Sequence, residues 1–129
     1  MPLATELGGA LLLGLAGATG AATRFAVTEW ATKRWQRSFP LATLVINVIG
    51  AFALGMLVTA GGASSNLAGV RLLLGTGFLG GYTTFSTLSY DTHSLFRSGQ
   101  RYAAWLNVLG SLALGILAAA LGIVCGAHL

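Results

Sequence analysis

The stretch GGYTTFSTLSYDT, residues 80–92, lies where a membrane-spanning helix is expected, yet it begins with two glycines and is rich in hydroxyl side chains. Glycine disfavours a helix through its backbone entropy, and the β-branched Thr83 and Thr84 disfavour it through restricted side-chain rotation. The stretch therefore predicts a break in this helix, located between Gly80 and Thr84.

The composition of the whole chain is that of an all-α membrane protein. It has 129 residues, of which 55% are hydrophobic and only 8% are charged, and its mean hydropathy is +0.79. Four segments almost free of charge are each long enough to cross a hydrocarbon core, for which roughly 20 helical residues suffice. These segments are residues 7–27, 41–60, 72–90 and 102–127. Because the connections between them are short, we expect a single four-helix transmembrane domain over residues 1–129.

Several features could suggest other assignments. The first segment could be a signal peptide, but only Glu6 and no Lys or Arg precedes it, and its apolar run is too long, so we expect a retained helix. Cys125 is the single cysteine and has no partner for a disulfide. His93 and His128 fall at a segment edge and near the chain end, and we expect both to be solvated at the interface.

The formal net charge of +4 does not indicate nucleic-acid binding, because the basic residues fall in short loops between apolar spans. Four crossings place the first and third loops on one face of the membrane. That face carries Lys33, Arg34, Arg37, Arg97 and Arg101, and the other face carries only Arg71. The excess of Lys and Arg predicts that the first and third loops lie in the cytoplasm.

Small and polar residues recur at four-residue spacing in several spans. Gly14 with Ala18, and Ala118 with Gly122 and Gly126, predict close helix packing. Thr43 with Asn47, and Asn107 with Ser111, form polar stripes on single helix faces. Such stripes form hydrogen bonds between helices, at about 0.6 kcal/mol each, or they line a path with neutral donors for an anion that must bind and leave. Periodicity alone leaves both interpretations open.

The break also has two interpretations. Carbonyl groups freed from a helix at membrane depth commonly coordinate a cation, whereas a simple kink would leave the threonines bonded back to their own helix. Phe85 follows the break directly; its positive ring edge can solvate an anion, although packing is the ordinary role of such a ring. Arg24 falls within the first span, where it is either functional or extends its side chain to the interface.

Three motifs resemble the CrcB/Fluc family of fluoride channels over nearly the whole chain. They are GATGAATRF at residues 17–25, TLVINVIGAFALG at residues 43–55 and GFLGGYTTFST at residues 77–87. The third motif is highly specific, and the order and spacing of all three strengthen the resemblance.

The resemblance implies an antiparallel, dual-topology dimer in the inner (plasma) membrane that passes fluoride passively out of the cytoplasm and reduces its toxicity. It also implies a structural Na⁺ that is not transported, held by backbone carbonyls at Gly80 and Thr83 of both subunits. Positions matching the fluoride pore are Thr43, Asn47, Phe85 and Ser111, together with Asn107 and the hydroxyl of Thr84 in the third segment; Arg24 matches the first-helix arginine that gives the vestibule its charge.

The chain departs from the family pattern at two positions. Leu88 stands where a second phenylalanine is usual, and Asn107 stands where a tyrosine is usual. A dimer that inserts both ways should also have little Lys/Arg asymmetry, whereas this chain has five such residues against one. These features suggest a subunit of fixed orientation that pairs with an oppositely oriented paralogue rather than with itself.

Two other functions compete with a channel. A small multidrug-type exporter would need an acid embedded in the membrane, but Glu6, Glu29 and Asp91 all fall at the ends of segments. A non-conducting structural subunit would keep any ion flux unchanged after Asn47→Ala or Phe85→Ala. We do not expect an enzyme, because no nucleophile, base and orienting group occur together.

Overall fold

The computed structural model describes residues 2–36, 39–63 and 65–129, so Arg37 lies outside the described residues. Three helices are long and apolar enough to cross a membrane: α1 (Pro2–Trp35), α2 (Leu41–Thr59) and α6 (Arg101–Ala127). They correspond to the first, second and fourth segments predicted from hydropathy. The third segment is helical too, but it is divided among several shorter elements.

The third crossing begins with a short turn, η1 (Ser65–Leu67), and α3 (Ala68–Arg71), which lead into a π-helix, η2 (Leu72–Leu79). It continues through α4 (Gly80–Tyr82), is interrupted at two extended residues, and resumes as α5 (Phe85–Arg97). Thr83 has φ −77° and ψ 157°, and Thr84 has φ −149° and ψ 121°. The break predicted near residues 80–84 is therefore confirmed.

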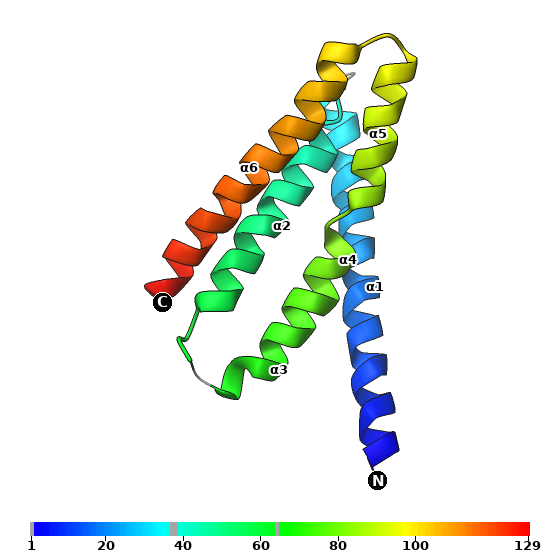
Figure 1. Ribbon diagram of the computed structural model, residues 1–129. Coiled ribbons are helices and arrows are strands. Elements are labelled where there is room, and N and C mark those ends of the chain that lie inside the picture. The colour runs from blue at the N-terminus through cyan, green and yellow to red at the C-terminus, as the bar shows by residue number, and fades with distance from the viewer. Residues whose placement is uncertain (1, 37–38, 64) are drawn as a thin grey trace.

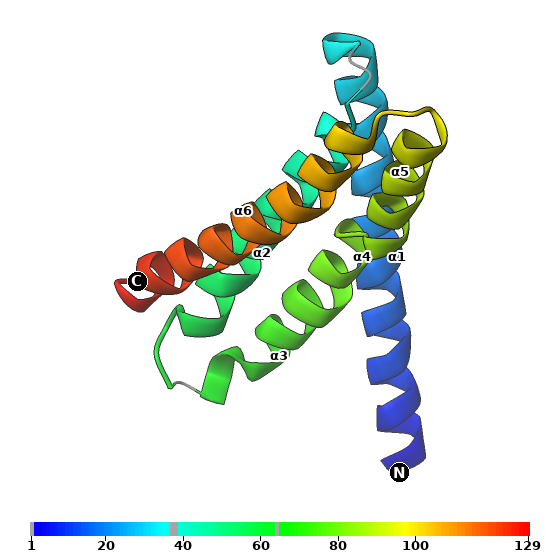
Figure 2. The ribbon, with the colours of Figure 1, turned by 45° about the horizontal axis from the view of Figure 1, so that its top comes forward.

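The chain crosses four times, with its connections alternating between two ends. Both termini and the α2–α3 connection lie at one end, and the α1–α2 and α5–α6 connections lie at the other (Figure 1). In both ribbon views α6 lies along α2, and α1 lies beside the junction of α4 and α5 (Figure 2). The first and third loops therefore share one end, as the sequence predicted, and the all-α fold is confirmed.

Glycine allows α2 and α6 to approach closely. Ala118, Gly122 and Gly126 are buried on α6, and a Cβ on Gly122 would clash with the carbonyl oxygen of Phe52 on α2. This is the packing predicted for that stripe. On α1 the contact is made by other residues than those predicted. Gly14 and Ala18 are exposed, and α1 contacts the third crossing through Gly17 and Gly20 instead.

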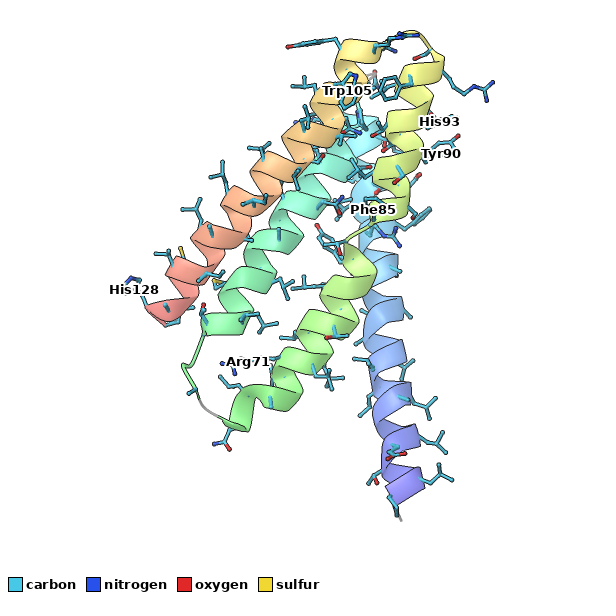
Figure 3. All side chains as sticks on the ribbon, in the orientation of Figure 1. Arg71, Phe85, Tyr90, His93, Trp105 and His128 are labelled. Atoms are coloured by element: carbon cyan, nitrogen blue, oxygen red, sulfur yellow. The ribbon has the colours of Figure 1, made fainter. Side chains whose placement is uncertain are left out.

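The end of α2 is held by a charged side chain from the third crossing. The Nε of Arg71 donates to the carbonyl of Leu57 at 3.2 Å, and its Nη2 donates to the carbonyls of Ala60 and Gly62 at 2.7 and 2.8 Å. Figure 3 shows Arg71 at the end of the molecule opposite Trp105. The last carbonyls of a helix have no partner within that helix, so the guanidinium satisfies groups that would otherwise be unpaired.

Candidate functional site

The break in the third crossing is held by a side chain from α2. The Oδ1 of Asn47 accepts a hydrogen bond from the backbone N–H of Thr84, and its Nδ2 donates to the carbonyl of Thr84, both at 2.9 Å. The amide of Asn47 thus pairs with both backbone groups of one extended residue. Because Thr84 is only 8% exposed, these groups would be costly to leave unpaired.

The hydroxyls at the break are bonded locally. The Oγ1 of Thr84 caps α5 by accepting the N–H of Thr87 at 3.1 Å. The hydroxyl of Thr83 donates to the carbonyl of Leu79 at 2.9 Å, which is the back-bonding expected of a kink. The hydroxyl of Thr83 is therefore committed to its own chain, and its carbonyl is the group left for a ligand.

Two carbonyls at the break lose their usual donors. In a continuous α-helix the N–H of Thr84 would donate to the carbonyl of Gly80, and the N–H of Thr87 would donate to that of Thr83. The first N–H instead bonds Asn47 and the second bonds the hydroxyl of Thr84. Carbonyl oxygens freed in this way at membrane depth suit a cation such as Na⁺. The backbone at Gly80 and Thr83 therefore fits such an ion.

A cavity of about 360 Å³ opens beside the break. Its lining includes Asn47, Gly80, Thr83, Thr84, Phe85 and Leu88. Phe85, the first residue of α5, is 80% exposed, so the described residues leave its ring largely uncovered (Figure 3). Leu88, which departs from the family pattern, lines this cavity too and lies with Phe85 along a second one of about 330 Å³.

A further cavity, of about 290 Å³, brings Arg24 together with Thr43 and Thr84. The Nε of Arg24 is buried and has no hydrogen-bond partner among the residues that the structure describes. Thr84 lines this cavity as well as the one beside the break. The two spaces therefore share a wall, with a guanidinium on one side and the amide of Asn47 on the other.

Both polar stripes form hydrogen bonds to α5. Thr43 donates to the Oδ2 of Asp91 at 2.9 Å, and the Nδ2 of Asn107 donates to the Oγ1 of Thr92 at 3.0 Å. The hydroxyl of Thr92 donates in turn to the carbonyl of Leu88 at 2.7 Å, so its proton is already used and the orientation of the Asn107 amide is fixed. Thr43 and Asn107 therefore form hydrogen bonds between helices, as one interpretation of these stripes predicts, and their place along an anion path stays a prediction.

Two polar atoms on α6 remain without a partner in the described part of the chain. They are the Oδ1 of Asn107 and the Oγ of Ser111, in side chains that are 1% and 9% exposed. Neither residue lines the two cavities that contain Thr84. The structure thus groups Asn47, Thr84 and Phe85 around the break and Arg24 with Thr43, and it places Asn107 and Ser111 apart from both groups.

The sequence did not predict the contact of Asp91 with α2. It placed this carboxylate at the end of a span, whereas the structure has it partly buried and bonded to Thr43. The available signal was helical periodicity within α5: Asp91 lies four residues after Thr87, on the same helix face. Thr92, the partner of Asn107, lies one position further.

The chain is similar to known proteins over most of its length. The model of a family described as "CrcB-like protein, Camphor Resistance (CrcB)" matches residues 11–123. A Roseiflexus protein named fluoride-specific ion channel FluC is 44% identical over 113 residues, covering 87% of this chain and 91% of the relative. A Bacillus cereus protein named fluoride-specific ion channel FluC 2 is 43% identical, covering 91% and 96%. A Parabacteroides distasonis protein, also named fluoride-specific ion channel FluC, is 42% identical, covering 92% of each chain. With most of its length matched, this four-crossing membrane protein belongs to the CrcB-like family.

Proposed function

We propose that this chain is a subunit of a fluoride-specific channel in the plasma membrane. The names of its relatives support this, and the observation that carries it is the cavity at the break, where an amide, hydroxyls and an exposed ring surround one space. Fluoride that enters as the neutral weak acid dissociates in the cytoplasm. It then leaves passively, down its electrochemical gradient, and its toxicity falls.

Removing the hydration shell of fluoride is the main cost of conduction, so the path must supply replacement donors. Arg24 has a buried N–H that no described residue pairs with, in a cavity walled by Thr43 and Thr84, and this suits the arrival of an anion. Asn47 uses one N–H on the carbonyl of Thr84 and has a second for the anion. Phe85 would add its ring edge, and Ser111 a hydroxyl that has no partner in the described part of the chain.

A Na⁺ at the break is part of this proposal. The carbonyls of Gly80 and Thr83 would hold it, because their helical donors are diverted to Asn47 and to the Thr84 hydroxyl. A bound Na⁺ supplies a fixed positive charge beside the anion path without being transported. If flux is unchanged when Na⁺ is removed from both sides of the membrane, this part of the proposal fails.

The partner we propose is a second, antiparallel subunit. The ring of Phe85 is 80% exposed and Gly80 is exposed beside it, although both belong to the proposed site. A second subunit at this face would cover the ring and contribute its own two carbonyls to the ion. The five-to-one charge bias favours an oppositely oriented paralogue over a second copy.

The first test is reconstitution of this chain alone in liposomes, with fluoride efflux followed by an electrode and with chloride as the control anion. Rapid, fluoride-selective efflux would establish a channel formed by copies of this chain and would contradict the need for a paralogue. If correctly folded protein shows no efflux, a counter-oriented paralogue should restore it. Absence of efflux with that paralogue as well would refute the channel function.

Substitutions at the break separate a channel from a structural subunit. Asn47→Ala and Phe85→Ala should each lower fluoride efflux at least about tenfold, the factor that corresponds to about 1.4 kcal/mol on the barrier. Leu112→Ala is a suitable control, because it truncates an exposed apolar side chain on α6 outside the cavities described. Unchanged efflux in both break variants would favour the structural subunit.

A further inference from the structure

We infer that Asn47 is the positioning residue of the cation site: its side-chain amide keeps the third crossing broken and thereby keeps the carbonyl of Gly80 free for an ion. The inference rests on the Na⁺ site proposed above. It gives Asn47 a second task beside any contact with fluoride, and it makes one side chain common to the anion path and the cation site.

The first step is the geometry of the pairing. Asn47 bonds both the N–H and the carbonyl of Thr84, each at 2.9 Å, although the two residues are 37 positions apart in the chain. A side-chain amide that satisfies both backbone groups of one residue acts as a neighbouring β-strand would. It therefore stabilises the extended conformation of Thr84, with φ −149° and ψ 121°, in place of a helical one.

The second step is competition for one donor. The buried N–H of Thr84 must have an acceptor. Two acceptors compete for it. One is the Oδ1 of Asn47, to which it donates in the structure. The other is the carbonyl of Gly80, to which it would donate if a continuous helix ran from α4 into α5. If Asn47 is absent, helix formation satisfies this N–H and uses the carbonyl of Gly80. The ion would then lose a ligand.

The third step is that the link works in both directions. A cation on the carbonyl of Gly80 removes the acceptor that a continuous helix needs, so it favours the broken form in which Asn47 is bonded to Thr84. The orientation of Asn47, and with it the direction of its second N–H, then depends on the cation site. Coupling of this kind is reciprocal, because each binding event favours the same backbone conformation.

The experiment measures thermal unfolding of the purified protein over a series of Na⁺ concentrations, with choline keeping the ionic strength constant. Its readout is the Na⁺ concentration that gives half-maximal stabilisation, which does not depend on flux. Asn47→Leu removes both hydrogen bonds to Thr84 at similar side-chain size. We expect it to raise this concentration by about tenfold or more, as the loss of a buried hydrogen bond implies.

Two further variants complete the design. Asn47→Ala also removes both hydrogen bonds to Thr84, without introducing a charge or a large side chain, and should raise the half-maximal Na⁺ concentration by about tenfold as well. Thr43→Val is the matched control, because it removes one hydrogen bond from the same face of α2 without touching the break. It should unfold at a lower temperature but respond to the same Na⁺ concentration.

The possible outcomes test the positioning role of Asn47 separately from the Na⁺ site on which it rests. If the wild type does not respond to Na⁺, the Na⁺ site itself is wrong. If the wild type responds and Asn47→Leu responds at the same concentration, the site stands and the positioning role is overturned. Should Asn47→Leu not unfold cooperatively, Asn47→Ala decides: if it responds at the Na⁺ concentration of the wild type, as Thr43→Val should, the positioning role is overturned.

Discussion

Asn107 is buried with its Nδ2 bonded to Thr92 and its Oδ1 without a donor among the described residues. Replacing it with leucine removes one hydrogen bond, worth about 1 kcal/mol, and also removes an unpaired acceptor whose burial costs about 1 to 3 kcal/mol. We therefore expect Asn107→Leu to unfold at the same temperature as the wild type or slightly above it, in a thermal unfolding experiment in detergent.

Thr92→Val is the comparison for this variant. It leaves the Nδ2 of Asn107 unpaired, and it should destabilise the protein by about 1 to 3 kcal/mol. An equally large loss in Asn107→Leu would contradict the prediction, because it would mean that the Oδ1 has a partner such as a bound water.

For single residues, the sequence predicted the position of the break and the shared helix face of Thr43 and Asn47, but not how these residues are bonded. The spacing of Thr43 and Asn47 placed both on one face of α2, and the run of glycines and threonines placed the break. The pairing of Asn47 with Thr84 depends on the rotation of α2 relative to a crossing 37 residues away, and local periodicity carries no information about that. The same reason hid the contact between Thr43 and Asp91.

The pair formed by α2 and α6 depends on small residues at their contact. Gly122→Ala places a Cβ against the backbone of Phe52, and overpacking of this kind costs about 1 to 3 kcal/mol. Gly115→Ala, on the same helix, is the matched control because no atom lies within 4 Å of its Cβ position. Thermal unfolding should show a clear loss for the first variant and little change for the second; equal effects would contradict this packing.

The connection between α2 and α3 depends on Arg71. Arg71→Met keeps the length of the side chain but removes the donors to the carbonyls of Leu57, Ala60 and Gly62. Because hydrogen bonds to a charged group contribute about 1.5 to 3 kcal/mol, we expect a loss of stability of that order. Arg97→Met, at the exposed end of α5, provides a control for loss of charge alone. Similar stability of both variants would contradict the capping role.

Among the elements, hydropathy predicted α1, α2 and α6 because each is an uninterrupted apolar run of sufficient length. It did not predict the π-helical winding of residues 72–79. That winding coincides with close contacts between α1 and the third crossing, where Gly17 and Gly20 approach Gly81 and Phe78. A choice between α- and π-helix that involves such contacts is a tertiary effect, which intrinsic propensity does not encode.

In the whole molecule, the basic side chains at the two ends differ in number and in how they are bonded. Lys33, Arg34, Arg97 and Arg101 belong to the end with the α1–α2 and α5–α6 connections, and Lys33 makes only an exposed ion pair with Glu29 at 3.6 Å. Arg71, at the other end, is bonded to three carbonyls. Free positive charge is therefore concentrated at one end, which favours a single orientation.

We expect tags on this protein, expressed alone, to be accessible from one side of the membrane only. Replacing Lys33, Arg34, Arg97 and Arg101 with glutamine should produce both orientations, because it removes the excess of Lys and Arg that sets a single orientation. Glu29→Gln is the control, since acidic residues contribute little to orientation. Both orientations in the unaltered protein would contradict a fixed-orientation subunit.

Four crossings with alternating connections were predictable from length and hydropathy alone, because a helix must be long enough to cross lipid and the short loops leave no other path. The partner of this chain was not predictable in this way, because pairing depends on the surface of the folded chain, which length and hydropathy do not describe. Phe85 and Gly80 are exposed on the face where we propose that a second subunit binds.

The 34-residue length of α1 relates the candidate site to the surrounding lipid. From Glu6 to Glu29 the helix measures about 34 Å at roughly 1.5 Å per residue, close to the hydrocarbon thickness of about 30 Å. Arg24 lies about 8 Å along the axis from Glu29 by the same rise. A bilayer with longer acyl chains immerses this guanidinium more deeply, at a greater energetic cost. The length of the lipid acyl chains therefore sets how deeply the cavity beside Arg24 lies in the membrane, without any change to the protein.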